Sequence, residues 1–277
     1  NIPDMTYSSG KTAVITGAGS GIGRALAQQL NREGCALFLS DIDAAGLADT
    51  VAGLERPDVP VRQQCVDVAD KQAMDAWAAA IAAQQPAVDI VINNAGVGYS
   101  DRVDACDYAN VQWLMGINFW GVVHGTMAFL PLLRRASQGH LVNISSIFGM
   151  IGVPTQSAYN ASKFAVRGYT EALRLEMQGS NVHVCCVHPG GVGTNIARRS
   201  RGGGADVTEE DKAAMFAQHV RTTAESAAAQ IIRAVEKRQP RLLIGNDARF
   251  INLLTRLFPV SYPRFMPGLG KIGQDLA

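Results

Sequence analysis

Four glycines fall within the eight residues from Thr16 to Gly23, directly between a short apolar run and a helical pattern. A strand that turns straight into a helix aims the helix N-terminus and its backbone N–H groups at one point, where a pyrophosphate can bind. Glycine suits such a turn because a Cβ would block the close approach of backbone and ligand. The glycines alone would also fit an ordinary flexible turn, but the flanking strand and helix favour dinucleotide binding.

The rest of the chain alternates short apolar runs with longer helical patterns, such as residues 23–33, 71–84 and 155–178. The apolar runs span residues 12–16, 36–40, 61–66, 90–93, 140–144, 182–187 and 241–244. Nearly continuous apolar runs are typical of strands buried on both faces of a parallel sheet. The alternation predicts an α/β fold, a doubly wound, Rossmann-like parallel sheet of about seven strands with helices on both faces.

The length of 277 residues suits one main domain. We expect residues 11–246 to form a single dinucleotide-binding catalytic domain, in which residues 196–216 act as a substrate lid because 198–204 is basic and glycine-rich. Residues 1–10 are expected to be an N-terminal extension without a secretory signal. Residues 247–277 are expected to be a C-terminal amphipathic helix and tail.

Charge and cysteine content narrow the classes of partner. The net charge of +1, with nearly equal numbers of both signs, argues against a nucleic-acid surface. No stretch approaches the roughly 20 apolar residues that span a bilayer, so no integral membrane segment is expected. The five cysteines lack metal-binding spacing and predict buried free thiols in a reducing cytoplasm. The five histidines show no ligand spacing, so no metal site is expected.

An acidic residue ends the second predicted strand. Asp41 stands 18 residues after Gly23, where a carboxylate can accept hydrogen bonds from both adenosine ribose hydroxyls and would repel a 2′-phosphate. No lysine or arginine occupies position 20 or 42, although Arg24 lies close by on the first helix. NAD is therefore favoured over NADP, and a turn or capping role is the alternative for Asp41. Asp67, after the third strand, would contact adenine or face solvent.

Tyr159 and Lys163 lie four residues apart in a helical pattern, which places both side chains on one face. A free tyrosine has a pKa near 10 and is a poor base at neutral pH. A fixed ammonium nearby, together with the positive charge of an oxidised nicotinamide, would favour the phenolate. The pair therefore indicates a tyrosine acid/base, although Tyr and Lys at this spacing also occur as ordinary surface pairs.

Six motifs in a fixed order resemble the short-chain dehydrogenase/reductase family, in its common subgroup with TGxxxGxG and YxxxK. They are the glycine turn, Asn93–Gly96, Asn118, Ser145–Ser146, Tyr159–Lys163 and Pro189–Gly190. The resemblance covers about residues 10–245. It implies an oxidoreductase that transfers a hydride between NAD(H) and an apolar secondary alcohol or ketone.

The resemblance also implies a catalytic set of four residues. Tyr159 would be the acid/base, and Ser146, rather than its neighbour Ser145, would donate a hydrogen bond to the substrate oxygen. Lys163 would bind the nicotinamide ribose. Asn118, expected in mid-helix, would hold a water that relays protons to Lys163.

A larger set of residues would surround the cofactor in a protein of this family. The expected contacts are Gly17, Ser20, Gly21, Ile22, Gly23, Asp41, Asp67, Val68, Asn94, Ala95, Gly96, Tyr159, Lys163, Pro189, Gly190, Val192 and Thr194. Among the neighbours of the fourth strand, Asn93 is also expected to line the adenosine side. Val192 and Thr194 would hold the carboxamide.

Ligands in open α/β sheets bind beyond the carboxyl ends of the strands. The residues expected to meet the substrate there are Ser146, Phe148, Val153, Tyr159 and Gly191. Because residues 147–153 are mostly apolar, the pocket is predicted to suit an uncharged small-molecule alcohol or carbonyl compound. The arginines of 198–204 would alternatively contact an anion.

Two helical faces remain for larger partners. Residues 247–258 are amphipathic and basic, and would dock on their own domain or a partner subunit, close the pocket, or contact a membrane surface. Small residues on one side of the Tyr159 helix permit close packing against the sheet or another helix; they are Ala161, Ala165, Gly168 and Ala172. Similar family members pair this helix, so the resemblance implies a homodimer or homotetramer.

Other functions fit parts of the pattern. A regulatory protein that senses NAD without turnover would need the glycine turn, but it would not need a proton relay of Asn118, Ser146, Tyr159 and Lys163. An NADP-dependent carbonyl reductase would need a cation near the adenosine ribose. A dehydratase or epimerase of the same fold fits the glycine spacing and chain length less well.

Overall fold

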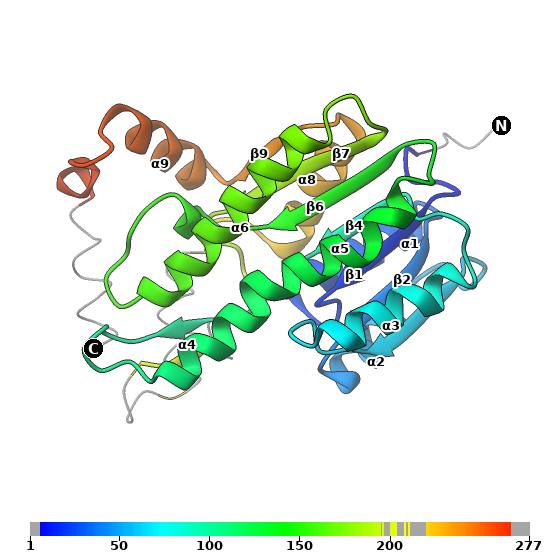
Figure 1. The fold of residues 1–277 in the computed structure, drawn as a ribbon, viewed down its shortest axis with the longest axis horizontal. Coiled ribbons are helices and arrows are strands. Elements are labelled where there is room, and N and C mark those ends of the chain that lie inside the picture. The colour runs from blue at the N-terminus through cyan, green and yellow to red at the C-terminus, as the bar shows by residue number, and fades with distance from the viewer. Residues whose placement is uncertain are drawn as a thin grey trace.

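The computed structural model describes residues 6–194, 196, 200–203, 208, 210 and 220–266. Seven parallel strands form one sheet in the order β3-β2-β1-β4-β6-β7-β9 (Figure 1). The strands are β1 (Thr12–Thr16), β2 (Ala36–Asp41), β3 (Val61–Cys65), β4 (Ile90–Asn93), β6 (Gly139–Ile144), β7 (Val182–Pro189) and β9 (Arg241–Ile244). The predicted Rossmann-like sheet is confirmed. The strand order reverses between β1 and β4, which is where such sheets bind ligands.

Helices cover both faces of the sheet. On one face lie α1 (Gly21–Arg32), α2 (Ala44–Ala52) and α8 (Ala224–Glu236); on the other lie α3 (Lys71–Ala82), α5 (Gly121–Leu133) and α6 (Ser157–Glu176). Leu26 and Ile231 are fully buried in the first core, and Met74 and Phe129 in the second. Two separate cores explain why the central strands are apolar on both sides.

The edge strand β3 differs from the central strands. Its sequence is VRQQC, and its last four residues are exposed because only one neighbour, β2, pairs with it. Cys65 is consequently exposed, which corrects the expectation that all the thiols are buried; Cys35, Cys185 and Cys186 are buried, and all five cysteines are free.

One long helical segment crosses the middle of the second face. It consists of α4 (Tyr108–Met115), a π-helical turn, η1 (Gly116–Trp120), and α5. By length and composition residues Tyr108–Leu133 could span a membrane, but half of its apolar window is buried. Phe129 and Leu133 are fully buried against the sheet, so the segment is used as a core helix.

The helix α6 begins later than its apolar pattern suggests. Residues 155–178 were expected to be helical, whereas the structure starts α6 at Ser157. Thr155 has φ +63°, in the left-handed region, which no helical residue adopts. The residues before α6 therefore form a turn, and this turn belongs to the loop beside the candidate site.

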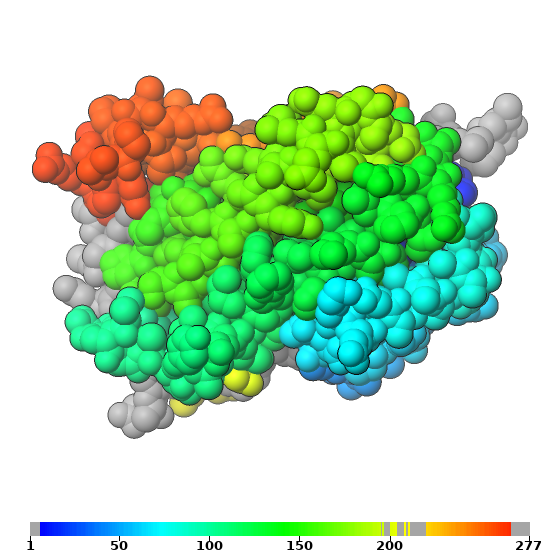
Figure 2. All heavy atoms as spheres, viewed as in Figure 1, coloured from blue at the N-terminus to red at the C-terminus, as the bar shows by residue number. Residues whose placement is uncertain are grey.

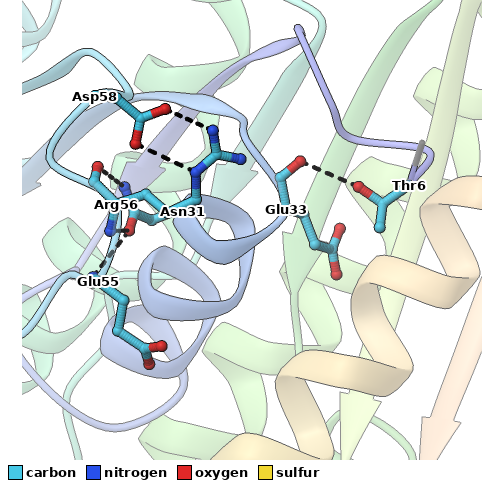
Figure 3. A network of polar contacts seen from close by, with 6 residues as sticks. All are labelled: Thr6, Asn31, Glu33, Glu55, Arg56 and Asp58. Carbon is cyan, nitrogen blue, oxygen red and sulfur yellow. Dashed lines mark hydrogen bonds and ion pairs between the residues drawn. The ribbon is translucent and has the colours of Figure 1, made fainter. Parts of the chain in front are cut away.

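A polar network fixes the far end of α1 (Figure 3). The buried side chain of Asn31 donates to the Arg56 carbonyl and accepts from the Glu55 and Arg56 backbone N–H groups. The Thr6 hydroxyl donates to the carbonyl of Glu33. Because one end of the helix is tied to two connecting segments, its N-terminus keeps a fixed direction at the opposite end.

The expected lid, residues 196–216, lies mostly outside the described residues. Within it, β8 (Arg201–Gly202) pairs in parallel with β5 (Tyr99–Ser100), a small sheet that the sequence patterns did not indicate. The Arg201 guanidinium lies 3.8 Å from the ring centre of Trp113. This stacking holds the described part of the segment against α4.

Candidate active site

The glycine turn forms a tight cradle at the N-terminus of α1. A Cβ on Gly23 would lie 2.1 Å from the Gly17 carbonyl oxygen, and one on Gly17 would lie 2.7 Å from the Cα of Ala95. Gly17 and Gly21 also have positive φ, at 67° and 52°. Ser20 is the N-cap of α1, yet its side chain makes no capping hydrogen bond. The first N–H groups of α1 are thus available to a ligand, and the cradle fits a pyrophosphate.

Residues after β4 support this cradle through hydrogen bonds. The Asn94 amide donates to the carbonyls of Thr16 and Gly17, at 3.0 and 3.1 Å, and the Thr16 hydroxyl accepts from the Asn94 and Ala95 N–H groups. Asn93 does not take the expected place on the adenosine side. Its side chain is buried, and its amide donates to Asn143 at 2.8 Å within the second core.

The Asp41 carboxylate lies beside the glycine turn. It accepts from the Gly19 N–H at 2.8 Å and from the Asp43 N–H at 2.9 Å. Arg24, the cation that could favour a 2′-phosphate, donates instead to the carbonyls of Gly19 and Gly46 and to the Thr50 hydroxyl. Asp41 therefore serves as a turn residue beside the glycine turn, and its expected contact with an adenosine ribose stays a prediction.

Two further residues follow β3. The Asp67 carboxylate is exposed and accepts from the Ala69 N–H at 2.9 Å. The Val68 side chain packs against Gly121 of α5, and its carbonyl lies 3.0 Å from Nδ1 of His124. A cofactor contact by Val68 would thus involve its backbone N–H rather than its side chain.

Tyr159 and Lys163 share one face of α6, as predicted. The Lys163 ammonium lies 5.7 Å from the ring centre of Tyr159. Burial raises the pKa of Tyr159 to about 12, and an interaction with the Ser146 side chain opposes the shift. Desolvation therefore outweighs the expected lowering of this pKa by the ammonium at this separation.

Lys163 is itself buried, at 3% exposure. Its ammonium donates to the Ile144 carbonyl at 3.1 Å, and burial lowers its pKa to about 8. A Cβ on Gly96 would lie 3.4 Å from the Lys163 Nζ and 3.3 Å from the Asn118 Oδ1, so these two polar groups flank Gly96. The glycine thus keeps a narrow polar space open beside the ammonium.

Asn118 lies in the π-helical turn rather than in a regular helix. Its Oδ1 accepts from the Val97 N–H at 2.8 Å, and its Nδ2 donates to the Val97 carbonyl and the Ser162 hydroxyl. The side chain thus clamps the segment after β4 to α6. The expected role in a proton relay stays a prediction, because Asn118 approaches Lys163 without a direct hydrogen bond between the described atoms.

The two serines after β6 have different surroundings. Ser145 is buried, and its hydroxyl donates to the Lys163 carbonyl at 2.8 Å. Ser146 is only half-buried and caps the short helix η2 (Ile147–Gly149), where its Oγ accepts from the Phe148 N–H. The Ser146 side chain interacts with Tyr159, so it faces the candidate reaction site while Ser145 holds α6 in place.

The loop after Ser146 is fixed by a residue that the sequence patterns did not single out. Asn160, next to Tyr159, is buried; its amide donates to the carbonyls of Phe148 and Ile151, both at 2.8 Å, and its Oδ1 accepts from the Val153 N–H. Phe148 packs edge-on against the Tyr159 ring with 5.9 Å between centroids. Val153, expected to meet the substrate, points instead into a core cluster.

The segment after β7 contacts α9 (Asn246–Leu257) near its start and the glycine turn near Thr194. The Asp247 carboxylate accepts from the Gly191 N–H at 2.9 Å, and a Cβ on Gly190 would collide with it. Thr194 lies over Gly21, whose Cβ would come within 3.1 Å of the Thr194 methyl. Asp247 was another residue without a sequence signal, and it holds the segment that leads from β7 to the glycine turn.

The structure thus brings together the glycine cradle, the Asp41 carboxylate and a Ser146–Tyr159–Lys163 group beyond the carboxyl ends of parallel strands. Such a set can hold a dinucleotide and exchange a proton with an oxygen on a bound small molecule. Half-buried Ser146, Phe148, Tyr159 and Gly191 are the expected substrate contacts that remain accessible.

Known proteins share this arrangement. The sequence model of the family described as short chain dehydrogenase matches residues 11–203. The Mycobacterium tuberculosis protein SadH, named as an oxidoreductase, is 45% identical over 269 residues, covering 95% of this chain and 96% of its own length. A Bacteroides thetaiotaomicron 3-ketodihydrosphingosine reductase is 37% identical over 183 residues, 66% of this chain and 64% of its own. A short-chain dehydrogenase/reductase from Burkholderia phymatum, crystallised with NAD, has 31% identity and a TM-score of 0.77, covering 86% of this chain and 90% of its own.

Proposed function

Because the chain belongs to the short-chain dehydrogenase/reductase family of oxidoreductases, we propose that it interconverts a secondary alcohol and a ketone, with NAD(H) as cofactor and Tyr159 as acid/base. The observation that carries the proposal is the half-buried Ser146 and Tyr159 pair beside the buried Lys163, in a chain that also forms the glycine cradle. When bound, the nicotinamide would accept or supply the hydride.

The chain's own groups divide the proton chemistry. With a pKa of about 12, Tyr159 holds its proton at neutral pH and can donate it to a carbonyl oxygen during reduction. With a pKa of about 8, Lys163 is mainly ammonium at pH 7 and stabilises the phenolate that remains. Ser146 orients the same oxygen by a hydrogen bond. In oxidation the same groups act in reverse.

An apolar substrate is the second part of the proposal. Phe148 is half-buried and lies edge-on against Tyr159, so an apolar part of the substrate would contact its ring and the substrate oxygen would be its main polar contact. The name of the Bacteroides relative, a reductase of 3-ketodihydrosphingosine, supports a ketone on an apolar chain. The five free thiols support a cytoplasmic location.

A panel of alcohols with NAD⁺, and of ketones with NADH, tests the activity through NADH absorbance. We expect turnover by the wild type and a 10²- to 10⁴-fold loss in Tyr159→Phe, because general acid–base catalysis contributes about that much. NADH binding, measured by fluorescence, should be equal in both proteins. Wild type and variant that bind NADH tightly yet are equally inert on the whole panel would instead identify an NAD sensor.

The cofactor preference is tested separately. Asp41 would repel a 2′-phosphate, and Arg24 is already engaged by two carbonyls and a hydroxyl. We expect kcat/KM to be higher with NAD⁺ than with NADP⁺ and the ratio to fall in Asp41→Ser. A wild-type preference for NADP⁺ would overturn this choice and favour an NADP-dependent carbonyl reductase.

A further inference from the structure

The helix α9 carries two apolar stripes. Ala248, Ile251 and Leu254 are buried, and the first two pack on the loop beside the candidate site. The second stripe, Phe250, Leu253 and Leu257, follows i, i+3, i+7 spacing and is more than half exposed at each position. One stripe accounts for the packing of α9 on its own domain. The other faces away from it.

Exposed apolar residues continue beyond the helix. Phe258, Val260 and Phe265 are 40%, 89% and 51% exposed, and the rings of Phe258 and Phe265 pack together with 4.8 Å between centroids. With Phe250, Leu253 and Leu257 they form what we call the C-terminal patch. It holds six of the thirteen exposed large apolar residues of the described chain. Apolar side chains concentrated in this way mark an interaction surface, whereas single ones do not.

The charge around the patch has one sign. Arg249, Arg256 and Arg264 are exposed, and no aspartate or glutamate occurs from residue 248 to 266. Arg249 and Arg256 are seven residues apart, so they share one face of α9, beside the exposed apolar stripe. Arginines in that position can keep their guanidinium groups at a polar interface while the neighbouring Phe and Leu side chains enter an apolar layer.

The charge also selects the occupant. A second copy of the chain docked patch to patch would bring two sets of three arginines together without an acidic partner. The surface of an anionic bilayer offers both an apolar layer and negative headgroups. We propose that the C-terminal patch docks the protein peripherally on an anionic lipid bilayer. This inference goes beyond the proposed function and needs no turnover.

The patch is rigidly connected to the candidate site. The Gly152 N–H donates to the Tyr262 hydroxyl at 2.8 Å, which joins the residues after α9 to the loop beside Tyr159. In Figures 1 and 2 the C-terminal segment, in orange and red, stands at one end of the molecule. Docking through it would bring the loop of Ile147 and Ile151 close to the lipid surface, where apolar substrates are concentrated.

Vesicle co-sedimentation tests the proposal with the full-length protein. We expect it to pellet with vesicles of phosphatidylserine and phosphatidylcholine, more weakly with phosphatidylcholine alone, and less as salt is raised. Replacing Arg249, Arg256 and Arg264 by Gln should weaken binding about a hundredfold, since each basic residue near such a surface contributes about fivefold. Phe250, Leu253 and Leu257→Ser should weaken it at least tenfold.

Matched variants distinguish vesicle binding through the C-terminal patch from nonspecific binding through any exposed cation or apolar side chain. Replacing three exposed cations elsewhere, Arg135, Arg233 and Lys237, by Gln, or the exposed Val103 by Ser, should leave vesicle binding unchanged. Circular dichroism and NADH binding confirm that each variant is folded. The proposal is overturned if wild type stays in the supernatant with anionic vesicles. It is also overturned if the control variants bind vesicles as weakly as the patch variants. The same holds if the Phe250, Leu253 and Leu257→Ser variant binds vesicles like the wild type but has a lower molecular mass in light scattering, since the patch would then join two copies of the chain.

Discussion

Two adjacent serines at the end of β6 have different roles because successive side chains of an extended chain point to opposite faces. Ser145 points inward, where its hydroxyl is the partner of the Lys163 carbonyl. Ser146 points outward and shares the site with Tyr159. Ser145 secures the helix that carries Tyr159, and Ser146 is the residue that we propose contacts the substrate oxygen. Neither can replace the other without a shift of the strand.

Substitution of each serine by alanine should separate these roles. Ser146→Ala should lower kcat by about 10²- to 10³-fold, as loss of a hydrogen-bond donor to a developing oxyanion does. Ser145→Ala removes a buried hydrogen bond to the Lys163 carbonyl and should cost about 0.5–1.5 kcal/mol of unfolding free energy. Kinetics and urea unfolding measure the two effects. Equal losses of kcat in both variants would contradict this division.

At the scale of elements, the loop between β6 and α6 depends on the helix that follows it. Asn160 lies in the first turn of α6, and its side chain makes hydrogen bonds to three backbone groups within residues 148–153. The same helix therefore carries Tyr159, the proposed acid/base, and fixes the loop that faces it. Tyr159 and the substrate loop should move as one unit.

Asn160→Ala should raise KM for the alcohol or ketone about tenfold, because the loop loses all three bonds, while NADH affinity stays near the wild-type value. Asn181→Ala is a matched control. Its amide donates to three carbonyls, of Leu133, Arg134 and Ala136, at the opposite end of the sheet. It should lower stability comparably without changing KM. A KM unchanged by Asn160→Ala would show that the loop is held by its apolar contacts alone.

The strands and the glycine cradle could be predicted from the sequence because both are local patterns. A nearly continuous apolar run favours a strand buried on both faces, and a glycine-rich turn between strand and helix has few other uses. Asn160 and Asp247 could not be predicted, since their partners are backbone groups brought near only by the fold. The π-helical turn around Asn118 was similarly hidden, because no sequence pattern marks it. The raised pKa of Tyr159 depends on burial, which spacing alone does not reveal.

At the scale of the whole molecule, two buried histidines make folding sensitive to acid. Burial, with Lys11, His183 and Arg238 nearby, lowers the pKa of His140 to about 3; burial lowers that of His188 to about 4. The unfolded chain binds these protons near pH 6.5. Between pH 6.5 and about 4 the unfolded state therefore binds more protons than the folded state, and stability falls as the pH falls.

Urea unfolding at pH 7, 6 and 5 should show this loss, up to about 1.4 kcal/mol per pH unit for each histidine. His140→Gln should reduce the slope, and the double variant with His188→Asn should reduce it further. Gln at position 140 can still reach the Tyr7 hydroxyl, which lies 2.6 Å from the His140 Nε2. A slope that stays the same in the double variant would assign the acid sensitivity to carboxylates instead.

Assembly is the last property of the whole molecule, and α6 bears on it. Val166 and Leu173 of α6 are buried against the sheet, while the small residues Ala161, Gly168 and Ala172 face outward. No described atom lies within 4 Å of a Cβ on Gly168, and Phe164 and Leu175 on the same helix are exposed. Small outward residues beside exposed apolar ones suit close packing against the same helix of a second copy, the homodimer or homotetramer that the family resemblance implies.

Gly168→Arg should therefore dissociate the oligomer, because a long charged side chain would enter a helix pair built for close approach. Light scattering should show a fall to the monomer mass, and Gly168→Ala should leave the mass unchanged. Ala79→Arg places the same charge on an exposed position of α3 and should also leave the mass unchanged. A monomeric wild type, or an oligomer that tolerates Gly168→Arg, would exclude this face. Because Gly168 lies on the outer side of α6, away from Tyr159 and Lys163, NADH binding by the monomer should survive, which separates assembly from folding.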